Sequence, residues 1–181
     1  CGSGILDVVS EMLRCGQIDQ TGRFTHRVIR RVGQGKDEAF ILIPQSESGS
    51  GKDILVTRSD VREIQLAKAA IRAGIEALLR ATSTDLTEVS QIVIAGAFGT
   101  YLNIESAVRI GMFPDLSHEH FLQIGNAAGV GAYEMLLSVE SRKKAEDLLQ
   151  RMSYIELTTD RGFTESYIEA IGFEEKLEDE K

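Results

Sequence analysis

The chain is poor in cysteine and in positive charge, and it has no long hydrophobic run. Two cysteines among 181 residues are too few for an iron–sulfur cluster, which typically takes four thiolates. Twenty Lys and Arg against 28 Asp and Glu give a net charge of −8, which argues against binding to a nucleic-acid backbone. No apolar run approaches the roughly 20 residues that span a bilayer, and no signal peptide is present. We therefore expect a cytoplasmic protein that contacts neither nucleic acid nor membrane.

The ends of the chain suggest its place in a larger protein. The first residue is Cys1 rather than Met, and a helical pattern starts at once, so we expect the carboxy-terminal piece of something longer. Cys15 lies at the far end of this predicted helix, about 20 Å from Cys1 at 1.5 Å per residue, which is too far for a disulfide. Cys15 is interpreted as a packed residue and Cys1 as a turn residue. Residues 174–181 form a charged tail.

Apolar spacing predicts alternating helices and strands in one folded unit over 1–173, since 43% hydrophobic residues suffice for a core. Ser3 is a candidate cap of the first helix, and Thr57 with Asp60 is a candidate capping box for the longest one, with Ser59 as the rival cap. We predict helices near 3–15, 60–82, 104–110, 125–139, 141–150 and 164–171. We predict strands at 24–32, 39–43, 54–56, 154–157, 121–124 and from 92 to the following glycines. This order indicates an α/β fold with a mixed sheet flanked by helices.

The most informative feature is a strand that ends in a glycine turn. The apolar run Ile92–Ala95 stops at Gly96, Ala97, Phe98 and Gly99. Such a turn either serves only the fold or lets main-chain N–H groups approach a ligand such as a nucleotide.

A second junction of the same kind follows strand 121–124. Gly125 and Asn126 open a helix rich in Gly and Ala, which also suits close helix packing, and Asn126 is a good helix cap. Two such junctions favour a nucleotide-binding half-site over a simple turn.

Gln65, Lys68 and Arg72 lie at positions i, i+3 and i+7 of the longest predicted helix. They form either a solvated polar face or a polar strip that reaches towards an adenine or ribose held on the glycine turn.

Two further patterns fail their chemical tests. Gly49–Lys52 resembles the end of a phosphate-binding loop, but Ser46 replaces the required first glycine and Asp53 the required Ser or Thr. His118 and His120 lie in a predicted loop with too few fixed ligands for a metal site. No acid–base pair or nucleophile–histidine dyad is visible, so the sequence predicts binding without catalytic residues and without a metal.

Four ordered segments nevertheless resemble one family over residues 1 to about 173. They are 1–7, 60–74, 95–103 and 125–132. Together these segments look like the carboxy-terminal part of the reductive activators of corrinoid proteins.

The resemblance implies an actin-like (ribonuclease H-like) ATPase lobe of the acetate and sugar kinase, heat-shock chaperone and actin superfamily. It implies ATP, with Mg, driving electrons from a [2Fe–2S] ferredoxin domain, absent from this chain, into a corrinoid protein. The corrinoid cobalt would pass from Co(II) to Co(I). The partner would be a corrinoid iron–sulfur protein or the corrinoid subunit of a methyltransferase, and a homodimer is left open.

By the same resemblance, the turn at 96–99 would hold adenosine. The adenine would be flanked by Gln65, Lys68 and Arg72. The helix near the hinge between lobes would begin with Gly125 and Asn126. Phosphate-binding hairpins and catalytic acids would lie outside the chain. The alternative is a docking module that contacts a corrinoid protein or a sister subunit without binding nucleotide.

Overall fold

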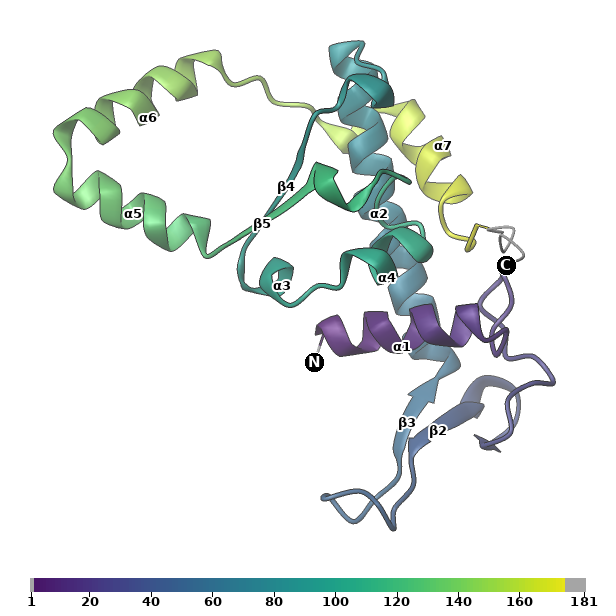
Figure 1. The fold of residues 1–181 in the computed structure, drawn as a ribbon. Coiled ribbons are helices and arrows are strands. Elements are labelled where there is room, and N and C mark those ends of the chain that lie inside the picture. The colour runs from purple at the N-terminus through teal and green to yellow at the C-terminus, as the bar shows by residue number, and fades with distance from the viewer. Residues whose placement is uncertain (1, 175–181) are drawn as a thin grey trace.

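The computed structural model describes residues 2–174, so the expectations for Cys1 and for most of the charged tail lie outside the described residues. Figure 1 shows the arrangement of helices and strands. The helices are α1 (Gly2–Arg14), α2 (Arg58–Thr82), α3 (Ala97–Thr100), α4 (Ile104–Arg109), α5 (Ala127–Leu137), α6 (Val139–Arg151) and α7 (Arg161–Glu169). The strands are β1 (Arg31–Val32), β2 (Ala39–Ile43), β3 (Ile54–Thr57), β4 (Ile92–Ala95) and β5 (Phe121–Gly125). Short 3₁₀ turns occur at Gly35–Asp37, Leu86–Glu88, His118–His120 and Leu157–Thr159.

The described strands form two small sheets. β1, β2 and β3 pair antiparallel in chain order. β4 and β5 pair in parallel, with Ile92 opposite Phe121. Parallel strands need a crossover, which α3 and α4 provide here. The α/β fold class is confirmed, and the two kinds of pairing lie in separate sheets.

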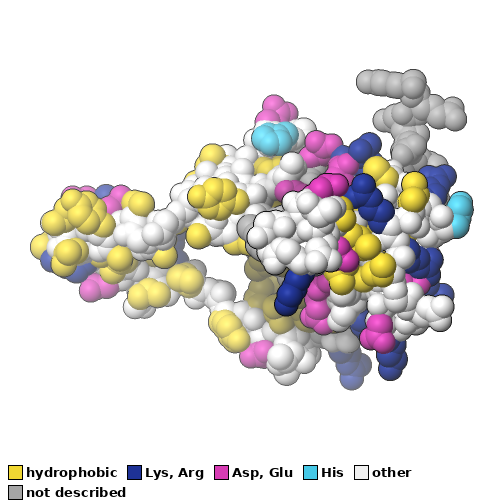
Figure 2. Space-filling model, turned by 90° about the horizontal axis from the view of Figure 1, so that it is seen from below, with side chains coloured by type: hydrophobic (Ala, Val, Ile, Leu, Met, Phe, Trp, Pro, Cys, Tyr) yellow, Lys and Arg dark blue, Asp and Glu magenta, His cyan; other side chains and the backbone are white. Residues whose placement is uncertain are grey.

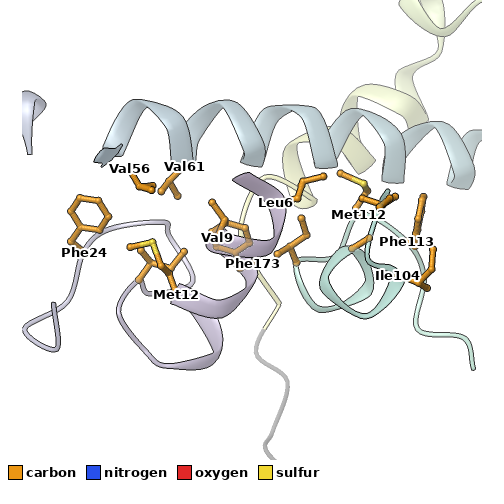
Figure 3. Packing of buried hydrophobic residues seen from close by; sticks show 14 of the residues in the cluster. Leu6, Val9, Met12, Phe24, Val56, Val61, Ile104, Met112, Phe113 and Phe173 are labelled. Atoms are coloured by element: carbon orange, nitrogen blue, oxygen red, sulfur yellow. The ribbon is translucent and has the colours of Figure 1, made fainter. Parts of the chain in front are cut away.

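α2 is the central element of the fold (Figure 1). The predicted capping box is confirmed at its start, because the Thr57 hydroxyl accepts from the Asp60 amide at 3.0 Å and the Asp60 carboxylate accepts from the Thr57 amide at 2.8 Å. Ser83 ends the helix in the left-handed conformation, φ 51°. α7 and α1 pack against α2, α4 packs against α1, and apolar residues from α1, α2, α4 and the segment after α7 meet in one core. Figure 3 shows these side chains, among them Leu6, Val9, Val61, Met112 and Phe173.

Four local predictions were wrong. The predicted strand at 24–32 shrinks to Arg31–Val32, because Thr25 instead bonds back to Gln17 in an irregular loop. The segment 154–157 is not a strand, since the Glu156 carboxylate accepts from the Thr158 amide and makes a turn. Helix α1 begins at Gly2, so Ser3 is not its cap. Cys15 is exposed rather than packed.

Helices α5 and α6 form an arm that projects from the body (Figures 1 and 2). Neither helix has a buried residue. Tyr133, Leu136 and Leu149 are each more than 60% exposed, which is unusual for large apolar side chains. Among the described residues, no helix has both the length and the apolarity that a membrane crossing demands.

Candidate functional site

The predicted turn lies where β4 ends. Gly96 has φ 105° and ψ 164°, a conformation that is open essentially to glycine alone. A Cβ at this position would meet no atom within 4 Å. The backbone is therefore uncovered on this side, and a ligand could approach it closely.

The structure brings the two glycine junctions together. The Gly96 amide donates to the Gly125 carbonyl at 2.6 Å, and Ala95 lies opposite Gly125 where the strand register shifts. The two parallel strands therefore end at the same edge, and ligands in α/β proteins commonly bind at the carboxyl ends of such strands.

Glycine is needed at position 99 because there is no room for a side chain, and not because the backbone there must stay uncovered. Gly99 is buried, and a Cβ there would lie 2.5 Å from Ile94 Cγ2. The Gln123 amide donates to the carbonyls of Gly99 and of Leu102, the latter at 2.9 Å. Gln123 thus fixes the turn from the neighbouring strand. Sequence reasoning missed this residue, although a glutamine inside an apolar strand is the kind of signal that could have found it.

Phe98 brings the first helix to the turn. A Cβ on Gly2 would lie 3.1 Å from the Phe98 ring, so a side chain at the start of α1 would push the ring aside by a few tenths of an ångström. The Phe98 side chain is still 48% exposed. An exposed aromatic ring beside open backbone offers a stacking surface for a flat ligand.

Asn126 is the cap of α5, as its residue type predicts. Its side-chain oxygen accepts from the Gly129 amide at 3.0 Å. Gly129 must be small, because a Cβ would lie 2.5 Å from the Asn126 amide nitrogen. Gly125, Asn126 and the turn at 96–99 therefore share one edge of the small parallel sheet.

Gln65, Lys68 and Arg72 follow one side of α2, but their described contacts go elsewhere than to the glycine turn. Lys68 Nζ donates to the Gly172 carbonyl at 2.5 Å and lies 5.4 Å from the centre of the Phe173 ring. Arg72 pairs with Glu76 at 2.9 Å. Their role beside an adenine stays a prediction.

The solvated-face interpretation is wrong for two of these three residues. Gln65 and Lys68 are only 4% and 1% exposed. Burial lowers the pKa of Lys68 from its usual 10.5 to about 8, although the nearby Glu174 carboxylate opposes this effect and Arg72 adds to it. Lys68 therefore fastens the segment after α7 onto α2.

The two rejected patterns lie apart from this edge. Gly49–Lys52 belongs to the exposed loop between β2 and β3. His118 and His120 lie in a 3₁₀ turn before β5, and the Ser117 hydroxyl contacts His120 Nδ1 at 2.8 Å. Within residues 2–174, no group of three or more His, Cys, Asp or Glu side chains could hold a metal ion.

Comparison with known proteins identifies the family. Residues 1–180 match the family model described as the C-terminal domain of RACo, the ASKHA domain. This chain belongs to that family, as the resemblance of its four segments predicted.

Individual relatives agree with the family. The chain is 37% identical over 177 residues to the corrinoid activation enzyme RamQ of Eubacterium limosum, covering 93% of this chain and 30% of that protein. It is 28% identical over 116 residues to a [Co(II) methylated amine-specific corrinoid protein] reductase of Methanosarcina barkeri, covering 64% of this chain and 21% of the reductase. A solved structure of a reductive activator for corrinoid, iron-sulfur protein superposes with a TM-score of 0.88 at 34% identity, over 96% of this chain and 28% of that one. The chain thus spans less than a third of the length of each relative.

Proposed function

We propose that this chain is the nucleotide-binding lobe of an ATP-dependent activator that reduces a corrinoid protein from Co(II) to Co(I). The family match and the names of the relatives support corrinoid activation. The observation that carries the nucleotide role is the uncovered backbone at Gly96, at the edge where β4 and β5 both end. Adenosine would lie over Gly96–Gly99 with its base on the Phe98 ring, and Gly125 and Asn126 would border it.

ATP supplies what an ordinary reductant lacks. The Co(I) state lies at very low potential, so electrons must be driven uphill, and a ligand can drive such a step only if it binds two states of the complex with different affinity. In this proposal Mg accompanies ATP, and electrons come from a [2Fe–2S] domain elsewhere in the full-length protein. The partner is a corrinoid iron–sulfur protein or the corrinoid subunit of a methyltransferase, in the cytoplasm.

The test is ATP binding to the intact protein by calorimetry, with Gly96→Val against wild type. Valine is strained at φ 105° and places its methyl groups where the base would lie, so we expect ATP affinity to fall by more than about tenfold, or 1.4 kcal/mol. Gly51→Val is the matched control, because Gly51 also has positive φ (66°) and open space around it but lies in the β2–β3 loop. Equal ATP affinity of the Gly96→Val variant and wild type would refute the adenosine role.

The second candidate function is a docking module that binds a corrinoid protein without nucleotide. The apolar arm of α5 and α6 favours it, since exposed residues such as Leu136 (76%) and Leu137 (67%) suit a protein interface. Pull-down of a corrinoid protein with the intact activator distinguishes the two functions. Retention that is equally strong with and without ATP, and lost in a Leu136→Ser/Leu137→Ser variant, would favour docking alone.

A further inference from the structure

A hollow lined by cations lies beside the first turns of α2, on the side of the loop at 19–23. Its volume is about 470 Å³, within the range of small-molecule sites. Arg23, Lys36, Arg58 and Arg62 line it, and no carboxylate is among its lining residues. In a chain of net charge −8, four cations around one hollow are a marked local excess. The view in Figure 2 likewise shows most Lys and Arg side chains of this face on the body rather than on the arm.

Local structure holds these cations in place. Arg58 and Arg62 are one helical turn apart, so both lie on the same side of α2. The Arg58 guanidinium donates to the Gly35 carbonyl at 3.2 Å, which ties the 3₁₀ turn carrying Lys36 to the start of α2. Neither Arg62 nor Lys36 has an ion pair within the described part of the chain.

Arg23 is placed by a loop built around Asp19. The Asp19 carboxylate accepts from the Thr21 amide at 2.8 Å, the Thr21 hydroxyl at 2.7 Å and the Arg23 amide at 3.0 Å. Although partial burial opposes the effect, these hydrogen bonds and the nearby Arg23 charge lower the pKa of Asp19. Arg23 therefore lines the hollow beside the Asp19 carboxylate, which is not itself among the lining residues.

Gln65 gives independent evidence of a ligand. Gln65 is only 4% exposed, it lines the hollow, and its side-chain amide makes no hydrogen bond with any of the described residues. The amide atoms are not among the buried unpaired side-chain atoms of the described residues, so they reach the hollow and can bond to what enters it. Gly22 packs directly against this amide, because a Cβ there would lie 2.6 Å from Gln65 Oε1.

A second hollow of about 480 Å³ adjoins the first and shares Thr21, Arg62 and Gln65 with it. Its other lining residues include Ile168, Ile171 and Phe173. Cations on one side and apolar side chains on the other match a molecule with a charged end and an organic end.

We propose that these joined hollows bind a phosphate-bearing small molecule. Guanidinium groups hold phosphoryl oxygens through paired, charge-assisted hydrogen bonds, and Arg23, Arg58 and Arg62 are placed to do so with Lys36. The Gln65 amide donates to an ester or phosphoryl oxygen, and Ile168 and Phe173 lie against the organic part. The site is separate from the proposed adenosine edge, since the start of α1 contacts Phe98 and the loop beyond its end forms this hollow.

The experiment is calorimetric titration of the intact protein with pyrophosphate and, separately, with phenyl phosphate. A Lys36→Gln/Arg62→Gln variant should bind either probe about 100-fold more weakly, since each lost charged hydrogen bond is worth about tenfold or more. Lys52→Gln removes another exposed lysine, which lies outside the hollow, and should bind as wild type does. Gly96→Val should also bind both probes normally, which separates this site from the proposed nucleotide site. Gln65→Glu, an isosteric change that adds a negative charge, should weaken both probes as well.

Each outcome decides the proposal. Phenyl phosphate that binds more tightly than pyrophosphate, and that loses affinity in Ile168→Ser, would assign an organic phosphate, and the reverse order would assign inorganic phosphate. The proposal fails if neither probe binds, if Lys52→Gln weakens binding as much as the double variant, or if only Gly96→Val abolishes it. Binding of hexaglutamate without binding of either phosphate would also overturn it, in favour of an acidic protein segment.

Discussion

Replacing Lys68 by Met tests how the end of the described chain is fastened to α2. Methionine keeps the length of the side chain in a site that is 1% exposed, but it removes the hydrogen bond to the Gly172 carbonyl and the cation from the Phe173 ring. Leaving the part-buried carbonyl unpaired costs about 1–3 kcal/mol, and losing the cation–π contact about 1–2 kcal/mol. Against this, the variant no longer buries a charge.

The pH dependence separates these opposing effects. The pKa of Lys68 falls from 10.5 to about 8 on folding, so between these values the unfolded chain binds more protons than the folded one. The contribution of Lys68 to the free energy of unfolding therefore rises as the pH increases from about 8 to 10.5. Below about pH 8 the folded protein bears the full cost of burying the charged ammonium group. The difference of 10.5 − 8 = 2.5 corresponds to about 3 kcal/mol at 1.36 kcal/mol per unit, of which about 2.5 kcal/mol is recovered by pH 10.

We expect urea unfolding, followed by circular dichroism, to show the two proteins close in stability at pH 7. At pH 10 the wild type should exceed Lys68→Met by about 2–3 kcal/mol more than at pH 7. Lys143→Met, which alters an exposed lysine on α6, controls for the general effect of alkaline pH. If the stabilities of wild type and Lys68→Met change in parallel between pH 7 and pH 10, the burial argument for this ammonium group is refuted.

Two further substitutions test the local geometry. Thr57→Ala removes the cap of α2. Loss of its bond to the Asp60 amide should lower the free energy of unfolding by about 1 kcal/mol, and a urea midpoint equal to that of wild type would contradict the capping box. Gly99→Ala places a methyl group 2.5 Å from Ile94 Cγ2. The strained packing should lower the free energy of unfolding by about 1–3 kcal/mol and weaken ATP binding in calorimetry. Unchanged stability and affinity would show that the turn tolerates a side chain.

Local signals explain what the sequence could predict. Thr57 and Asp60 are three residues apart, so the capping box depends on nothing beyond one helical turn, and it is found as expected. Likewise, β4 and the turn at Gly96 follow from an apolar run next to a residue without a side chain. The pairing of β4 with β5 completes this picture and places Gly125 at the same edge.

Contacts between distant residues explain what the sequence could not predict. The partner of Lys68 is the carbonyl of Gly172, 104 positions later, so helical spacing alone could not tell a solvated face from a buried one. Gln65 is buried through the loop at Gly22, whose position depends on the carboxylate of Asp19. A polar strip on a helix therefore predicts spacing but not its surroundings, and the adenine role of these side chains needs its own test.

The chemistry of the glycine edge limits what this lobe could do in the proposed activator. It offers an open main chain at Gly96 and the exposed ring of Phe98, which suit a neutral, flat base rather than a triphosphate with four negative charges. Phosphates and Mg require cations, carboxylates or hairpin amides converging on one point, and residues 2–174 contain no cluster of acidic or histidine ligands. The glycine edge itself offers no such group, so if ATP binds as proposed, its phosphates must contact a part of the protein beyond this edge. Closure of that part over the nucleotide would then couple ATP to the geometry of electron transfer, because such coupling requires the ligand to contact both moving parts.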